Sequence, residues 1–168
     1  YENTFIWFQS DNAAESGRND RASADNSLGN LGRPGSYVYV GPRWSEVSNT
    51  PFKLWKSTLA EGGHSVPAIA RLPKQHAQIS QFDGLTHLTD LAPTFLELAG
   101  VEDPGSAYQG RRVAPITGKS LLPLLDGRAE TVRTETDVLA DEQNNHRYVI
   151  RGRWKLLWLA SNGPTPAR

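Results

Sequence analysis

Two neighbouring oxygen-bearing side chains, Asp11 and Asn12, stand where an apolar run of the sequence stops. The run is TFIWFQ, residues 4–9. A carboxylate beside an amide is a hard-donor pair suited to Ca²⁺ or Mg²⁺. Because adjacent side chains diverge on a regular strand, both can face one ion only if the strand ends here. The alternative is a turn or a helix cap, which is the commoner use of an Asp-Asn pair after a strand.

Lys56 and His64 are further candidates, each weaker when taken alone. Lys56 falls in a predicted helix, where a lone lysine usually lies on a solvated face. His64 follows two glycines and could contact a ligand, although a single histidine usually does not. The four histidines show no metal-ligand spacing. The sequence contains no Gly-rich phosphate loop, G-x-S-x-G elbow or HExxH motif.

The apolar run also predicts the element that positions the Asp-Asn pair. Residues 4–9 are aromatic and β-branched and end at Ser, Asp and Asn, which favours a buried parallel strand with a polar carboxyl end. In open α/β sheets, ligands bind at that end of the strands. Residues 13–44 then form a long polar segment, and such loops are usually functional or disordered. Its aromatic residues Tyr37, Tyr39 and Trp44 favour an ordered lid or rim, with a loop merely anchored by aromatics as the equal alternative.

Further helices and strands follow in alternation. Pro51 fits the first turn of a helix running to about residue 60, and residues 66–72 predict another buried strand. The clearest helix is predicted between Asp90, its N-cap candidate, and Gly100, which stops it. Its apolar residues share one face, as in an amphipathic helix. Residues 118–127 predict a short helical turn.

The pattern changes after residue 130. Alternating residues with turn clusters at EQNNH and RGR are typical of antiparallel strands. We therefore expect an α/β fold in which a parallel α/β portion gives way to an antiparallel sheet near residue 130. That sheet looks unfinished at SNGPTPAR, because no closing helix follows it.

The amino-acid composition limits which functional classes of protein remain possible. Eighteen basic and eighteen acidic residues balance, so nothing global favours nucleic acid or a membrane surface. The apolar content of 38% suffices for a core, and the apolar runs are far shorter than the roughly 18 residues of a membrane span. Cys is absent, which excludes disulfides and thiol nucleophiles in this chain but leaves bacterial cytoplasm and periplasm equally open. Met is absent too, so we expect Tyr1 not to be a translation start.

Six segments resemble the C-terminal half of type I sulfatases in order and spacing, and the bacterial arylsulfatases most. They are NTFIWFQSDNAAE, NSLGNLGRPGSYVYVGPRW, LWKSTLAEGGHSVPAIARLP, LTDLAPTFLELAGV, GRRVAPITGKSLLPLL and YVIRGRWKLLWL. The resemblance covers nearly the whole chain. It implies that residues 1–128 are the C-terminal part of a catalytic α/β domain, with part of an alkaline-phosphatase-like mixed sheet and its flanking helices. Residues 129–168 would begin a C-terminal antiparallel-sheet subdomain that is incomplete.

The resemblance also assigns residues. Asp11 and Asn12 match the pair that binds the active-site cation, usually Ca²⁺, with Mg²⁺ as the alternative. Lys56 matches the lysine that contacts the sulfate. Two positions depart from the family pattern: Ala13 stands where Gly is usual, and Ser65 stands where many relatives have Arg. The second departure leaves the anion and substrate contacts open, and we assign His64 no more than a rim role.

The family nucleophile, a formylglycine made in a C/S-x-P-x-R segment of the N-terminal half, has no counterpart in this chain. The resemblance therefore implies that the chain needs the N-terminal half of the same enzyme as its partner to hydrolyse a small sulfate ester, and that it is inactive alone. Two alternatives remain. One is a phosphonate or phosphate-ester hydrolase of the same superfamily, and the other is a non-catalytic anion-binding domain.

Overall fold

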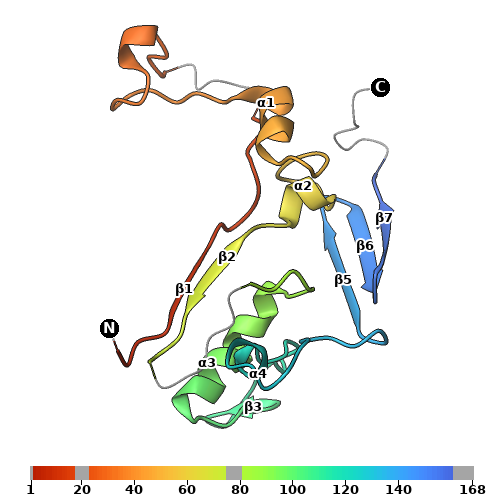
Figure 1. Ribbon diagram of the computed structural model, residues 1–168. Helices are drawn as coiled ribbons and strands as arrows, with labels where there is room; N and C mark the ends of the chain where they lie inside the picture. The colour runs from red at the N-terminus through yellow and green to blue at the C-terminus, as the bar shows by residue number, and fades with distance from the viewer. Residues whose placement is uncertain (1, 18–22, 75–80, 161–168) are drawn as a thin grey trace. The chain divides into compact units, whose positions relative to one another are not determined.

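The computed structural model describes residues 2–17, 23–74 and 81–160 (Figure 1). The chain forms two compact units. Unit 1 comprises Tyr1–Trp7 and Ala70–Asp137, and unit 2 comprises Phe8–Ile69 and Val138–Arg168. His76 and the segment SNGPTPAR lie outside the described residues. None of the described helices combines the length and the apolar character needed to cross a bilayer.

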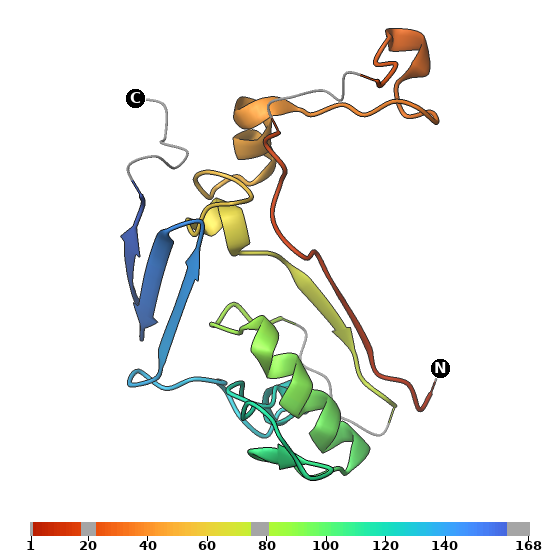
Figure 2. The ribbon, with the colours of Figure 1, turned by 180° about the vertical axis from the view of Figure 1, so that it is seen from behind.

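The apolar run before Asp11 forms strand β1 (Ile6–Gln9), which pairs with β2 (Ala68–Arg71) in a two-stranded sheet (Figures 1 and 2). The Lys74 amide donates to the Glu2 carbonyl, and the Arg71 guanidinium donates to the Thr4 carbonyl. The contact thus moves forward along one segment as it moves backward along the other. In Figure 1 the chain accordingly rises from the N-terminus along β1, whereas the arrow of β2 points back down. The prediction that residues 4–9 form a parallel strand is therefore wrong for this pairing, because an apolar run indicates a strand without specifying the direction of its neighbour.

Burial along these two strands also differs from the prediction. Phe8 on β1 is 70% exposed and Ile69 on β2 is 68% exposed, so neither strand is buried on both faces. Leu72, just after β2, is buried in the core of unit 1. The described residues thus cover one face of this strand pair better than the other.

Unit 1 contains the helix that the sequence predicts most clearly. Helix α3 (Leu91–Ala99) ends at Gly100, whose φ of 65° suits a residue without a Cβ. The 3-10 turn η2 (Leu88–Asp90) precedes it, and the predicted helical turn is α4 (Leu122–Leu125). A two-stranded ribbon, β3 (Ala107–Tyr108) and β4 (Arg111–Arg112), lies between them in the sequence. The buried core consists of leucines: Leu72, Leu121, Leu122 and Leu125.

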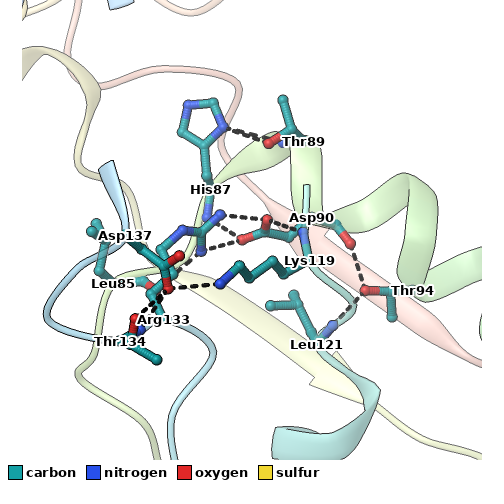
Figure 3. Close-up of polar contacts among 10 residues, drawn as sticks. All are labelled: Leu85, His87, Thr89, Asp90, Thr94, Lys119, Leu121, Arg133, Thr134 and Asp137. Atoms are coloured by element: carbon teal, nitrogen blue, oxygen red, sulfur yellow. Dashed lines mark hydrogen bonds and ion pairs between the residues drawn. The ribbon is translucent and has the colours of Figure 1, made fainter. Parts of the chain in front are cut away.

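The carboxylate of Asp90 ties this unit together, as Figure 3 shows. Its two oxygens accept hydrogen bonds from Arg133 at 2.5 and 2.6 Å, from the His87 amide at 2.7 Å and from the Lys119 amide at 2.9 Å. Asp90 precedes α3, but its side chain does not cap that helix. The predicted N-cap is thus a hub for three other segments, joined to the core where Thr94 donates to the Asp90 carbonyl.

Unit 2 contains a helix earlier than predicted. The 3-10 turn η1 (Leu28–Asn30) is followed by α1 (Gly41–Ser48), with Pro42 in its first turn. The predicted helix from residue 51 to about 60 is absent from this described segment, which folds instead as a compact loop. Helix α2 (Glu61–His64) comes only after that loop. Propensity misled here because Pro51 lies inside a turn closed by the Phe52 amide and the Asn49 carbonyl, and the left-handed residues Leu54 and Ser57 then interrupt any helix.

The antiparallel strands expected after residue 130 are confirmed. Strands β5 (Val138–Gln143), β6 (His146–Arg151) and β7 (Trp154–Trp158) form one sheet. Asn144 and Asn145 connect the first pair with φ of 54° and 64°, the conformation of a type I′ hairpin turn. The sheet begins at Val138, while the boundary at residue 128 stays a prediction.

Candidate metal and anion site

Asp11 and Asn12 lie two and three residues beyond the last residue of β1, in unit 2. The Ser10 hydroxyl donates to the Asn12 carbonyl at 2.6 Å and holds the turn. Within the described part of the chain, the Asp11 carboxylate and the Asn12 side-chain amide have no hydrogen-bond or ion-pair partner. Their oxygen atoms are therefore free to bind a ligand.

The chemistry of this pair fits part of a Ca²⁺ shell. A carboxylate and an amide oxygen are hard donors, and Ca²⁺ takes six to eight oxygens in all. No group of three or more His, Cys, Asp or Glu side chains gathers among the residues that the structure describes. Asp11 and Asn12 would hence supply two ligands, and the others would have to come from elsewhere.

Lys56 lies in the loop that replaces the predicted helix. Leu54 and Ser57 on either side of it have φ of 68° and 74°, a left-handed conformation that non-glycine residues seldom adopt. Such strain occurs where the surrounding structure imposes it, often at functional sites. The lysine side chain is 39% exposed and its Nζ lies 3.1 Å from Glu15 Oε2.

Hydrogen bonds bring the Asp-Asn segment and the lysine loop together within unit 2. The Lys56 amide donates to the Ala14 carbonyl at 3.1 Å. The hydroxyl of Ser45, which is fully buried on α1, donates to the Glu15 carbonyl at 2.7 Å. The backbone directly after Asn12 is thus fixed against the backbone of Lys56, although the two segments are more than 40 residues apart in sequence.

Glu15 is a site residue that the sequence did not reveal. Partial burial works to raise the pKa of its carboxyl, but the hydrogen bond from Lys56 and the backbone amide of Gly17 outweigh it and hold the pKa below its usual value. Glu15 is therefore charged near neutral pH and compensates Lys56. No local pattern singles out Glu15, because its partner Lys56 is distant in the sequence.

The two glycines before His64 have a steric reason. A Cβ on Gly62 would collide with the carbonyl oxygens of Lys53 and Leu54, and one on Gly63 would collide with that of Thr58. The lysine loop therefore packs directly on the backbone of α2. This close approach fixes where the loop carries Lys56.

His64 itself faces β7 through Lys155. The Lys155 ammonium donates to His64 Nε2 at 2.6 Å, to Glu61 Oε1 at 2.5 Å and to the Leu59 carbonyl at 2.7 Å. The imidazole also stacks on Tyr148, with ring centroids 5.1 Å apart. His64 Nε2 thus serves as an acceptor inside the protein, and a rim role toward a ligand stays a prediction.

The long polar segment is ordered by its own side chains over the described residues 23–40. Asn26 Oδ1 accepts from the Tyr37 amide at 2.8 Å, and Asn26 Nδ2 donates to the Tyr37 carbonyl at 3.1 Å. The Tyr37 and Tyr39 rings meet edge to face at 5.2 Å. Trp44 lies on α1 with 66% of its surface exposed. A lid or rim function stays a prediction.

Comparison with known proteins adds a second line of evidence. A family model described as Sulfatase matches residues 1–101. An uncharacterized sulfatase of Schizosaccharomyces pombe is 34% identical over 96% of this chain, and an arylsulfatase of Klebsiella aerogenes is 33% identical over 80% of it. A steryl-sulfatase of Mus musculus is 33% identical over 73% of this chain. The chain spans 31%, 31% and 19% of the length of these three relatives, respectively.

Proposed function

The chain belongs to the sulfatase family, and from this premise we propose that it supplies the metal-binding and sulfate-binding part of an enzyme that hydrolyses sulfate esters, with aryl sulfates as the substrate class. The nucleophile, a formylglycine, would come from the N-terminal half of the same enzyme. The fold of the whole would be alkaline-phosphatase-like, with residues 1–128 in the catalytic α/β domain. Residues 129–168 would begin the antiparallel-sheet subdomain.

Asp11 and Asn12 are the proposed metal ligands. Their free oxygen atoms at the end of β1 support this role, as does the preference of Ca²⁺ for such donors. A bound divalent cation would polarise the sulfate and favour ionisation of the attacking hydroxyl. The bond from Ser10 to the Asn12 carbonyl limits the movement of the pair before the ion binds.

Lys56 is the proposed sulfate-binding residue. Its ammonium is partly exposed, and its partner Glu15 is 45% exposed, so the ion pair is open to solvent. Exposed ion pairs are worth about 0–1 kcal/mol, hence an incoming sulfate can compete for the ammonium at little cost. Lys56 would then neutralise charge on the sulfate as the ester bond breaks.

One observation carries the proposal: the Lys56 amide donates to the Ala14 carbonyl, two residues after Asn12. This bond places a cationic side chain and two hard oxygen donors on adjoining segments of one unit. A metal ion and a lysine that both contact one sulfate would stabilise the charge that develops as its ester bond breaks. A turn or cap function of the Asp-Asn pair would need no such neighbour.

Steady-state assays of the complete gene product test the proposal. Aryl sulfate should be hydrolysed with a higher kcat/KM than the matched aryl phosphonate and phosphate monoesters. Lys56→Ala should lower kcat/KM about 100-fold or more, because it removes one charge-stabilising donor. Lys53→Ala, an exposed lysine of the same loop, is the matched control and should change it less than twofold.

The outcomes separate the alternatives. A preference for phosphonate or phosphate would support the other hydrolase class of the superfamily. Binding of sulfate without turnover of any ester would support a non-catalytic anion-binding domain. An intact-mass measurement should show the loss that accompanies formylglycine formation, and its absence would contradict the proposed nucleophile.

Calcium titration tests the ligand assignment directly. Asp11→Ala should remove most of the Ca²⁺ affinity of the gene product, since it deletes the charged ligand of the pair. Asp25→Ala is the control, because Asp25 is an exposed carboxylate whose contact is the Ser27 amide within its own turn. Equal calcium affinity in the two variants would refute the assignment.

A further inference from the structure

Asn49 uses its whole side-chain amide to join three segments around the proposed site. It follows α1 as the C-cap residue and is half-buried. Its Oδ1 accepts from the Ala14 amide at 3.2 Å. Its Nδ2 donates to the Leu54 carbonyl at 3.0 Å and to the Gly62 carbonyl at 2.7 Å. Both protons and the oxygen of the amide are therefore engaged with backbone groups.

The three partners lie next to the proposed functional residues. Ala14 is two residues after Asn12, and Leu54 is two residues before Lys56. Gly62 belongs to α2, on which the lysine loop packs. From this geometry we propose that Asn49 is a positioning residue that holds the metal-binding segment and the sulfate-binding lysine in register. This inference rests on the proposed function, and it deepens it by adding a residue that touches neither metal nor sulfate.

Backbone strain explains why the loop needs such a residue. Leu54 has a φ of 68°, which a non-glycine residue holds only when its surroundings over-determine it. The Asn49 bond to the Leu54 carbonyl is one such constraint, and the Leu54 amide is held by Glu46 Oε1 at 3.2 Å. Removing the first constraint should let the loop relax toward ordinary backbone angles and carry Lys56 away from its position.

Two substitutions of Asn49 test the acceptor and the donor groups of its amide separately. Asn49→Asp keeps an oxygen that accepts from the Ala14 amide but places a carboxylate without protons against two carbonyl oxygens. Asn49→Leu has a similar volume and removes all three bonds. The first variant should release the lysine loop alone, and the second should release the metal-binding segment as well.

Asn26 offers a matched control. It also bridges two stretches of chain, through the pair of bonds with the Tyr37 backbone, but it lies in the polar segment before α1. Asn26→Asp and Asn26→Leu therefore remove comparable bonds away from the site. Both should leave Ca²⁺ affinity within twofold of the unmodified protein and hydrogen exchange of residues 53–59 unchanged.

The experiment measures three quantities in the complete gene product: kinetics with an aryl sulfate, Ca²⁺ affinity by calorimetry and hydrogen exchange of backbone amides. Partners that orient metal ligands typically contribute 10- to 100-fold in affinity or activity. Asn49→Asp should lower kcat/KM about 10- to 100-fold with Ca²⁺ affinity within about threefold. Asn49→Leu should lower both by about tenfold or more.

Hydrogen exchange locates the effect. Amides of residues 53–59 should exchange faster in both Asn49 variants, while those of residues 11–17 should exchange faster only in Asn49→Leu. The inference is overturned if Asn49→Leu and Asn26→Leu behave alike, or if exchange rises equally throughout unit 2. Because exchange and calcium affinity need no turnover, they decide it even if the unmodified protein hydrolyses no sulfate ester, a result that would refute only the proposed function.

Discussion

Two ion pairs, one in each unit, show opposite uses of the same chemistry. In unit 1, Arg133 and Asp90 are 7% and 0% exposed, and both carboxylate oxygens carry two hydrogen bonds. In unit 2, Lys56 and Glu15 are 39% and 45% exposed and meet through one contact at 3.1 Å. The first pair has no capacity left for a ligand, and the second can exchange its partner. The number of hydrogen bonds to the carboxylate and the burial of both side chains thus distinguish a structural ion pair from a candidate binding pair.

Breaking the buried pair should have the largest effect on stability. Arg133→Ala leaves the Asp90 carboxylate buried without its charged partner, which costs about 3–5 kcal/mol in the free energy of unfolding. Urea denaturation measures the change. The matched control is Lys74→Ala, because Lys74 is 76% exposed and pairs with Glu2, which is 79% exposed. That variant should cost less than about 1 kcal/mol, and equal losses in the two would contradict the distinction.

Disturbing the backbone contact beneath the lysine loop should rank second. Gly63→Ala places a methyl group against the Thr58 carbonyl, and overpacking of this kind costs about 1–3 kcal/mol. The same variant should lower kcat/KM for an aryl sulfate, since the loop that carries Lys56 must shift. Gly29→Ala is the control, because a Cβ there meets nothing within 4 Å. A Gly63→Ala protein as stable and active as Gly29→Ala would show that the loop does not pack on α2 in solution.

Removing the open pair should have the smallest effect on folding. Lys56→Ala should lower the free energy of unfolding by less than about 1 kcal/mol, as expected for an exposed ion pair. This small loss, beside the loss of activity expected above, would separate a functional residue from a structural one. Denaturation of the Lys56→Ala and Lys53→Ala proteins measures it, and a loss as large as that of Arg133→Ala would place Lys56 in the structural class.

The sequence was a good guide where local rules decide the structure. Gly100 ends α3, and the adjacent asparagines 144 and 145 form the hairpin turn of the last sheet, because both positions need a left-handed backbone. The Asp-Asn pair after β1 was also visible, since a strand that stops at polar oxygens is a local pattern. Its assignment to a metal remains a prediction.

Non-local contacts account for what the sequence did not reveal. The pairing of β1 with β2 is antiparallel, and no local pattern records the direction of a partner some 60 residues away. The lysine loop is not helical because α2 and Asn49 hold its backbone from outside. Glu15 gains its role only when the fold brings Lys56 to it. In each case a tertiary contact overrides local propensity.

The pH dependence of stability should show how firmly the Lys56–Glu15 pair is held compared with an ion pair of unit 1. Its folded-state pKa is lowered, so the ion pair with Lys56 contributes fully above the unfolded pKa near 4.5 and is lost as the pH falls through the lower folded value. We therefore expect Glu15→Gln to cost less than about 1 kcal/mol at pH 7 and nothing at lower pH. In unit 1, Lys119 and the Thr134 amide lower the pKa of Asp137 to about 2, so that contact should persist to more acidic pH. Denaturation of the unmodified, Glu15→Gln and Asp137→Asn proteins between pH 7 and pH 2 measures both windows. A Glu15 contribution that persists to lower pH than that of Asp137 would reverse the comparison, because it would make the Lys56 pair the more tightly held of the two.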